Sequence, residues 1–492
     1  MTNPLLSKTT LDKLAPNVSK PCTAVLGAKP GIVHLGIGAF HRAHQAVYTE
    51  DAMNAQGGDW RITGVSLRGS IVREQLQAQD HLYSVIERSE DGAKARIVGA
   101  VGKVLFAPEN PQAVIDAIAA PTTHVVSTTI TEKGYNHDPA TGALLVDLPD
   151  ISNDLNLSNT PKTALGYLVR GLKARMDKGN GPLNVISCDN LPDNGHIFER
   201  LVIEFCQSVA PEMLGWVKDN IAFPCTMVDR IVPAATDEAL SIAERTLGIR
   251  DEMALLTEPF KQWVIEDKFL APRPAWEVAG AEIVRDVAAY EAMKLRLLNG
   301  SHSAIAYLGY LSGHETVSDA IAVPALRTFV RQLMDEEATP TLKIPSGFNV
   351  CKYKDDLIKR FANPTLAHKT WQIAMDGSQK LPQRLLDMLY ENMAKGGATG
   401  ATALAIAAWM QYVGGIDEKG HAIDVSDPIA DELADVHKRA GGNVGEIVNG
   451  FLSIEKIFGS CDTQPLGLDI IMTDALSQLR VNGAMYSVEN YC

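Results

Sequence analysis

The fold is decided by residues 31–41, which run Gly31-Ile-Val-His-Leu-Gly36-Ile-Gly38-Ala-Phe-His41. The first six are mostly apolar and end in glycine, a pattern typical of a short buried strand. Residues 39–55 then follow a helical pattern. A glycine turn between a strand and a helix lets backbone N–H groups meet a pyrophosphate at the helix N-terminus. The segment therefore predicts the start of a dinucleotide-binding domain, although His41 stands where the usual fingerprint has a third glycine and a lone Gly-x-Gly also occurs in ordinary tight turns.

Strand and helix patterns alternate along the chain after this turn. The β-rich runs are 60–67, 122–130, 184–187 and 227–232. The helical runs between them are 112–119, 164–178 and 196–210. Such alternation predicts a mostly parallel sheet with helices on its faces. From about residue 285 the pattern becomes helical, over 290–311, 323–337, 354–361, 382–393 and 401–413. We therefore expect a Rossmann-type α/β domain over 1–284 and a mainly helical domain over 285–492.

The composition limits the class of partner. The 492 residues carry a formal net charge of −14, which argues against nucleic acid or an anionic membrane as the main partner. The seven cysteines form no Cys-x-x-Cys pair, and no His, Cys and carboxylate set has metal-ligand spacing. Reduced thiols, a polar N-terminus and no apolar run of membrane-spanning length predict a cytoplasmic protein with no bound metal.

The position expected to bind the ribose does not decide between coenzymes. The second β-rich run ends in Gly64-Val-Ser-Leu-Arg68-Gly-Ser70, with no carboxylate to hold a ribose 2′-hydroxyl. Arg68 could meet a 2′-phosphate, which would favour NADP. It could equally stack on the adenine or face solvent. NAD and NADP both remain open on this ground.

Three polar residues are predicted to share one helix face. At about 100° per residue, Lys294, Asn299 and His302 fall within an arc of roughly 140°. A lysine whose pKa is lowered could take a proton from a substrate hydroxyl, and an asparagine could donate to the developing alkoxide. Asn190 follows a predicted strand at the carboxyl edge, where α/β sites form, and could be a second donor. The alternative is a solvated lysine beside a helix-breaking Asn-Gly pair.

With these motifs in place, the chain resembles the polyol-specific long-chain dehydrogenases, the mannitol dehydrogenase family. The resemblance runs from about Gly31 to Phe458 and rests on six segments: 31–44, 127–134, 187–190, 223–233, 258–267 and 293–303. It implies a Rossmann domain, a helical substrate domain and metal-free catalysis by a chain that often works as a monomer. It further implies that Lys294 is the general acid/base, that Asn190 and Asn299 polarise the carbonyl, and that His302 binds substrate.

The resemblance also implies the remaining contacts. Asp229 and Lys380 match positions that line the substrate pocket; the alternative for Asp229 is a structural ion pair with Arg230. The expected cofactor contacts are Gly36, Gly38, Ala39, Phe40, His41, Arg68 and Thr129. We expect NAD as the cofactor, with NADP not excluded.

Within the family, the run Thr370-Trp-Gln-Ile-Ala-Met-Asp-Gly-Ser-Gln-Lys-Leu-Pro-Gln-Arg384 is similar to that of the fructuronate reductases, also called D-mannonate oxidoreductases. Mannitol 2-dehydrogenases carry arginine where this chain has Gln372. Lys380 and Arg384 are the expected partners of a hexonate carboxylate, because a buried carboxylate needs a charged or hydrogen-bonding partner. Two alternatives stay open: a polyol dehydrogenase acting on mannitol and fructose, and a nucleotide-binding sensor without turnover.

Overall fold

The computed structural model describes residues 3–90, 92–138 and 141–491. The chain forms two compact units, Met1–Ala288 and Ala289–Cys492, and the division between them falls inside α11 (Ala288–Met293). The sequence predicts this change four residues earlier, at 284–285, where β12 (Glu282–Val284) ends. Among the described residues, no helix has the length and apolar character that a bilayer crossing requires.

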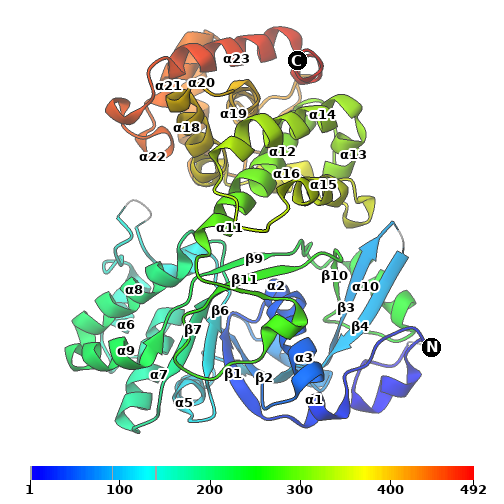
Figure 1. Cartoon of the computed structure of the whole chain (residues 1–492), viewed down its shortest axis with the longest axis vertical. Helices are drawn as coiled ribbons and strands as arrows, with labels where there is room; N and C mark the ends of the chain where they lie inside the picture. The colour runs from blue at the N-terminus through cyan, green and yellow to red at the C-terminus, as the bar shows by residue number, and fades with distance from the viewer. Residues whose placement is uncertain (1–2, 91, 139–140, 492) are drawn as a thin grey trace. The chain divides into compact units, whose positions relative to one another are not determined.

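The first unit is built on a six-stranded parallel sheet with the strand order β5-β2-β1-β6-β7-β8 (Figure 1). The strands are β1 (Pro30–Leu35), β2 (Arg61–Ser66), β5 (Val101–Phe106), β6 (Val125–Thr128), β7 (Leu183–Ser187) and β8 (Ile221–Ala222). Counted along the chain, this is the 3-2-1-4-5-6 order of a Rossmann fold. The direction of winding reverses between β1 and β6, so the crevice that binds nucleotides in such folds lies beyond the carboxyl ends of these two strands. The predicted fold class is confirmed.

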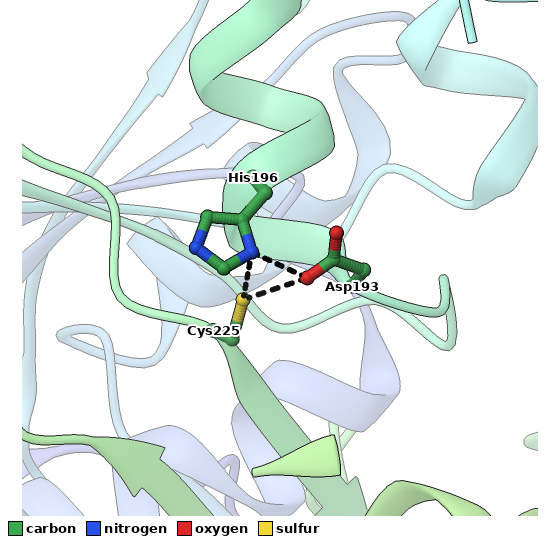
Figure 2. A group of neighbouring side chains, drawn as sticks. All are labelled: Asp193, His196 and Cys225. Carbon is green, nitrogen blue, oxygen red and sulfur yellow. Dashed lines mark hydrogen bonds and ion pairs between the residues drawn. The ribbon is translucent and has the colours of Figure 1, made fainter. Parts of the chain in front are cut away.

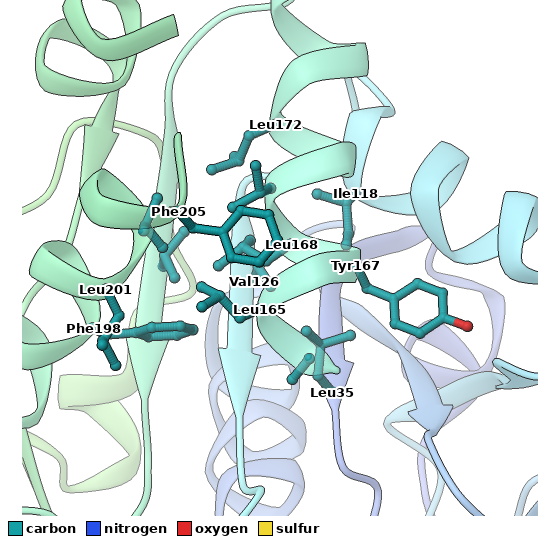
Figure 3. Packing of buried hydrophobic residues seen from close by; sticks show 14 of the residues in the cluster. Leu35, Ile118, Val126, Leu165, Tyr167, Leu168, Leu172, Phe198, Leu201 and Phe205 are labelled. Atoms are coloured by element: carbon teal, nitrogen blue, oxygen red, sulfur yellow. The ribbon is translucent and has the colours of Figure 1, made fainter. Parts of the chain in front are cut away.

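Helices cover both faces of this sheet. They are α1 (Thr23–Gly27), α2 (Ala39–Ala43), α3 (Gln45–Gln56), α4 (Ile71–Ala78), α5 (Pro111–Ala119), α6 (Pro149–Asp154), α7 (Ala164–Asp177), α8 (Asn194–Val209) and α9 (Leu214–Asn220). Helix α10 (Asp237–Leu247) packs instead against the separate strand β10 (Leu255–Thr257). Figure 3 shows one face, where Leu168 of α7 and Phe205 of α8 pack over Val126 of β6. The central strands are buried along nearly their whole length, which explains their continuous Val, Ile and Leu runs.

The prediction for residues 227–232 was wrong in one respect. β9 (Thr226–Asp229) is a strand, but it pairs antiparallel with β11 (Gln262–Glu266) in a separate three-stranded sheet with β12. A short apolar run shows that a strand forms and does not show which strand it pairs with. Strand β5 and a second small sheet, made of β3 (Tyr83–Ser89), β4 (Gly92–Val98) and β10 (Leu255–Thr257), are additions to the predicted elements.

The second unit is helical, as predicted. Its helices are α12 (Ser301–Leu311), α13 (Val317–Ala322), α14 (Pro324–Gln332), α15 (Val350–Phe361), α16 (Thr370–Ala374), α17 (Gly377–Leu381), α18 (Asp387–Lys395), α19 (Gly400–Tyr412), α20 (Ala430–Ala440), α21 (Val444–Leu452), α22 (Glu455–Phe458), α23 (Leu468–Asn482) and α24 (Ala484–Glu489). Helix α19 is apolar on all sides and buried, because it packs against both α12 and α23. Within residues 289–491, which the structure describes, three segments are π-helical: Lys294–Gly300, Leu333–Ala338 and Pro382–Leu386. Two of them carry predicted site residues.

Candidate functional site

The glycine turn after β1 has the shape of a phosphate cradle. Gly36 has φ +95°, and a Cβ there would lie 2.2 Å from the Thr129 carbonyl oxygen, so only glycine fits. The amide N–H groups of Gly36 and Ile37 both donate to the Val65 carbonyl, at 2.9 and 3.2 Å, which fixes the turn to β2. Gly38 immediately precedes α2, and a Cβ there would have one neighbour within 4 Å, the Gly36 oxygen at 3.8 Å. This open approach to the backbone fits a dinucleotide pyrophosphate, and any larger side chain would fill it.

His41 stands at the position of the third fingerprint glycine, and its side chain is buried in the protein. Its ring stacks on that of His34 with centroids 3.4 Å apart and an interplanar angle of 14°. His34 in turn contacts the Ser127 hydroxyl at 2.8 Å and the Thr129 hydroxyl at 2.9 Å. Burial lowers the pKa of His34 to about 3, and burial followed by the charge of His34 lowers the pKa of His41 well below its usual value. The two rings are therefore neutral and can stack without repulsion.

The other predicted cofactor residues lie around the same turn. The Thr129 hydroxyl donates to the Gly36 carbonyl at 2.8 Å, and the Phe40 ring stacks on His44 at 5.0 Å. Arg68 is exposed in the loop after β2, where the Ser66 hydroxyl donates to the Gly69 carbonyl at 2.5 Å. This exposed position is compatible both with a 2′-phosphate and with solvent.

Asn190 follows β7 at the carboxyl edge of the sheet, as predicted, and is exposed. The residue before it, Asp189, is a contact that the sequence analysis missed. Its buried carboxylate accepts the N–H groups of Ile130 at 3.1 Å and Thr131 at 2.8 Å, and the Tyr135 hydroxyl at 2.8 Å. Asp189 therefore holds the loops after β6 and β7 together and positions the chain at Asn190. The available signal was a carboxylate placed directly after a buried strand.

Asp229 is buried at the end of β9, and its neighbour Arg230 is buried as well. Arg230 forms an ion pair with Glu87 at 2.6 Å. The same guanidinium donates to the carbonyls of Ala43 at 2.6 Å and Glu258 at 3.0 Å. Arg230 thus ties the β3–β4 hairpin and the end of α2 to the segment after β9, which is a structural role.

In the second unit, the helical geometry at Lys294 differs from the prediction. The sequence predicts an α-helix, whereas Lys294–Gly300 is a π-helical turn between α11 and α12. A turn with i→i+5 bonding winds less per residue than an α-helix, so Lys294 and Asn299 lie closer to one face than an α-helix would place them. Lys294 is buried, and His302 follows in the first turn of α12, also buried. π-Helical turns are frequent at functional sites.

A second π-helical turn packs directly on the first. A Cβ on Gly300 would lie 2.8 Å from the carbonyl oxygen of Arg384, so glycine is what permits this contact. Arg384 donates to the Ser303 hydroxyl at 3.2 Å, and Lys380 donates to the Met375 carbonyl at 2.5 Å. The structure therefore brings the predicted residues of 380–384 next to the start of α12.

These residues form what we call the cation cluster, made of Arg360, Lys380 and Arg384 around His302. Burial, then His368 and the three cations, lower the pKa of His302 well below its usual value, so its ring is neutral. The ring lies against Phe361 at 4.8 Å and against His368 at 5.2 Å. Arg360 and His368 are not among the predicted site residues, because they stand on or after α15, about sixty residues further along the chain than His302.

The structure also gathers a group that the sequence spacing did not indicate. One donor atom each of Asp193, His196 and Cys225 lies within 4.8 Å of the others (Figure 2). His196 follows Asp193 by three residues, whereas Cys225 is far along the chain. All six described cysteines are free thiols.

The strand order, the glycine turn at the switch point and the lysine–asparagine pair define an oxidoreductase with a dinucleotide-binding domain. Family models match both units: the mannitol dehydrogenase Rossmann domain over residues 30–278 and the mannitol dehydrogenase C-terminal domain over residues 286–476. The chain therefore belongs to the mannitol dehydrogenase family, whose members are dehydrogenases acting on secondary alcohols.

Relatives cover nearly the whole chain. The "Uncharacterized oxidoreductase YeiQ" of Escherichia coli (strain K12) is 50% identical over 430 residues, which is 87% of this chain and 88% of that protein. The D-mannonate oxidoreductase of Escherichia coli (strain K12) is 45% identical over 460 residues, 92% of this chain and 94% of that protein. Among solved structures, Pseudomonas fluorescens mannitol 2-dehydrogenase in a ternary complex with NAD and D-mannitol matches with a TM-score of 0.90 at 36% identity, covering 99% of each chain.

Proposed function

We propose that this protein catalyses reversible hydride transfer between NAD(H) and C5 of a sugar acid, D-mannonate/D-fructuronate, with Lys294 as general acid/base and without a catalytic metal. The observation that carries the substrate assignment is the cation cluster. Three positive side chains gather near the same buried histidine, where a substrate carboxylate would meet them. A neutral polyol needs no cationic partner, whereas a hexonate carboxylate does.

The magnitude favours a charged substrate. Two unit charges about 4 Å apart attract by about 4 kcal/mol at an effective dielectric constant of 20. Hydrogen bonds to charged groups contribute about 1.5–3 kcal/mol each. The 45% identity to a D-mannonate oxidoreductase supports the same substrate class.

Each of the proposed site residues has a separate role in the reaction. Bound NADH supplies the hydride to the ketone carbon. Asn190 and Asn299 donate hydrogen bonds to the ketone oxygen, and this stabilises the negative charge that develops there. Lys294 gives its proton to that oxygen in the reductive direction and takes it back in the oxidative direction. His302 and Asp229 bind the substrate hydroxyls.

The first test replaces the proton donor. Lys294→Ala should lose most of kcat, and its pH profile should lose one ionisation, because the group that exchanges the proton is gone. Coenzyme affinity, measured by the fluorescence of bound NADH, should stay as in the wild type. A variant with unchanged kcat would remove Lys294 from this role.

The second test measures whether Arg384 binds the substrate carboxylate. Arg384→Gln should lower kcat/KM for D-fructuronate by about 10- to 150-fold, corresponding to the 1.5–3 kcal/mol of one charged hydrogen bond. Its kcat/KM for fructose should change little. The control is Arg439→Gln, which removes an exposed arginine on α20 of the same unit. Equal losses for both sugars in Arg384→Gln would contradict the carboxylate assignment.

The alternative function is the same chemistry on an uncharged polyol, mannitol to fructose. It is favoured by the likeness to a mannitol 2-dehydrogenase over 99% of both chains. The decisive measurement is kcat/KM for D-fructuronate and for fructose, with NADH and with NADPH. A preference for fructose supports the polyol activity, and NADH binding without turnover on any hexuronate or ketose supports the sensor.

A further inference from the structure

Asp193, His196 and Cys225 converge at the start of α8, outside the dinucleotide turn and the cation cluster (Figure 2). Asp193 is the residue that precedes α8, and it has a left-handed backbone with φ 53°. Its Oδ1 lies 2.5 Å from His196 Nδ1 and 3.5 Å from Cys225 Sγ. Cys225 Sγ lies 3.6 Å from the same His196 Nδ1.

The backbone holds the three residues in place. A Cβ on Gly195 would lie 2.6 Å from the Cys225 nitrogen, so the start of α8 packs directly on the segment before β9. The Cys225 N–H donates to the Glu266 carboxylate at 3.0 Å, and the Glu266 N–H donates back to the Cys225 carbonyl at 2.9 Å. The Asn194 side chain donates to the Asp189 and Thr226 carbonyls, at 3.2 and 2.9 Å. The thiol position is therefore fixed by β11 and by α8 together.

The distances match a tetrahedral zinc site. With Zn–N near 2.05 Å and Zn–S near 2.3 Å, tetrahedral angles put the nitrogen and the sulfur about 3.5–3.6 Å apart, and an oxygen and the sulfur equally far. The two separations that involve Cys225 already have these values. Only the His196–Asp193 separation must open, by about 0.8 Å. Both of these side chains are more than half exposed, so they can rotate to do so.

A nucleophilic Cys-His-Asp triad fits the geometry less well. In such a triad the cysteine and the carboxylate contact opposite nitrogens of the imidazole, so that the ring can pass a proton between them. Here both contact Nδ1.

We propose that Asp193 Oδ1, His196 Nδ1 and Cys225 Sγ form a binding site for a borderline transition-metal ion, Zn²⁺ in the first place. One thiolate, one imidazole and one carboxylate suit Zn²⁺ and not Mg²⁺ or Ca²⁺, which prefer all-oxygen shells. Three protein ligands leave the fourth position to water. The ion joins the start of α8 to the strand β9 and so fixes the loop that begins at Asn190. This site does not depend on the proposed function.

The test uses Co²⁺, which takes the ligands and geometry of Zn²⁺ but absorbs visible light. The full-length chain, first stripped with a chelator, is titrated with Co²⁺ and then with Zn²⁺. We expect one Co²⁺ per chain with a thiolate-to-cobalt charge-transfer band and tetrahedral d–d bands, all displaced by Zn²⁺. Zn²⁺ should also raise the unfolding temperature, because a ligand that binds the folded state stabilises it.

Matched variants assign the ligands. Cys225→Ser should abolish the charge-transfer band, and His196→Gln should weaken Co²⁺ binding at least tenfold. Two control variants should keep both the charge-transfer band and the Co²⁺ affinity. They are His421→Gln, which changes an exposed Asp417–His421 pair, and Cys461→Ser, which removes an exposed thiol. NADH binding by each variant checks that the first unit is folded. A missing thiolate band, or a band that survives in Cys225→Ser, would overturn the site.

Discussion

At Gly300 the two π-helical turns pack so closely that one added methyl group would push them apart. In Gly300→Ala the new Cβ would lie 2.8 Å from the carbonyl oxygen of Arg384. That oxygen belongs to the backbone and cannot rotate away, so the segments Lys294–Gly300 and Pro382–Leu386 must move apart by about 0.5 Å. We expect the substitution to displace Asn299 and Arg384 together.

The size of the effect follows from two considerations. Overpacking a filled interior costs about 1–3 kcal/mol, which corresponds to a fall in unfolding temperature of about 2–4 °C per kcal/mol for a unit of this size. Misplacing catalytic groups by about 1 Å can cost about 100-fold in rate, so a shift of half that distance should cost about tenfold in kcat/KM. The loss should be larger for D-fructuronate than for fructose, because Arg384 moves with the contact.

The assay combines thermal unfolding with steady-state kinetics on both sugars. The control is Gly445→Ala in α21, where the nearest atom to the new Cβ is the Asn443 side-chain oxygen at an ordinary 3.5 Å. That variant should keep wild-type kinetics and stability, or gain slightly from the helix propensity of alanine. If Gly300→Ala matched the control in both measurements, the close contact would have no role in aligning the site.

Two further predictions concern other parts of the chain. Gly36→Ala forces a side chain into a left-handed backbone and against the Thr129 carbonyl, so it should cost about 1–3 kcal/mol of stability. The substitution should also raise KM for NADH at least tenfold, while kcat changes less. An unchanged KM for NADH would place the pyrophosphate elsewhere. His302 has a pKa well below its unfolded value, so between the two values the unfolded chain binds a proton that the folded chain does not. Its contribution to stability is complete above about pH 6.5 and is lost as the pH falls below that value, with a slope of about 1.4 kcal/mol per pH unit. Thermal unfolding from pH 7.5 to 5 should therefore be less pH-dependent in His302→Gln than in the wild type, and parallel curves would contradict the buried neutral ring.

Much of the fold could be predicted from local pattern. The strands around Gly36, the helices between them and the helical second unit all follow from hydrophobic periodicity and turn residues, which act over a few neighbours. The pairing of β9 with β11 could not be predicted this way, because strand partners are chosen by packing over long separations. Local pattern also does not predict the π-helical turn at Lys294, which packs against the turn at Arg384, about ninety residues away.

The same distinction between local pattern and long-range packing applies to the site. The chemical groups of the site can be read from the chain directly: the glycines of the turn, Lys294 with Asn299, and the run that ends at Arg384. What surrounds them depends on tertiary packing, which places Asp189 under Asn190, Arg360 and His368 beside His302, and Cys225 against the start of α8. The reason is physical: a side chain's chemistry is written in the sequence, whereas its pKa, its alignment and its partners are set by neighbours that folding brings from distant parts of the chain.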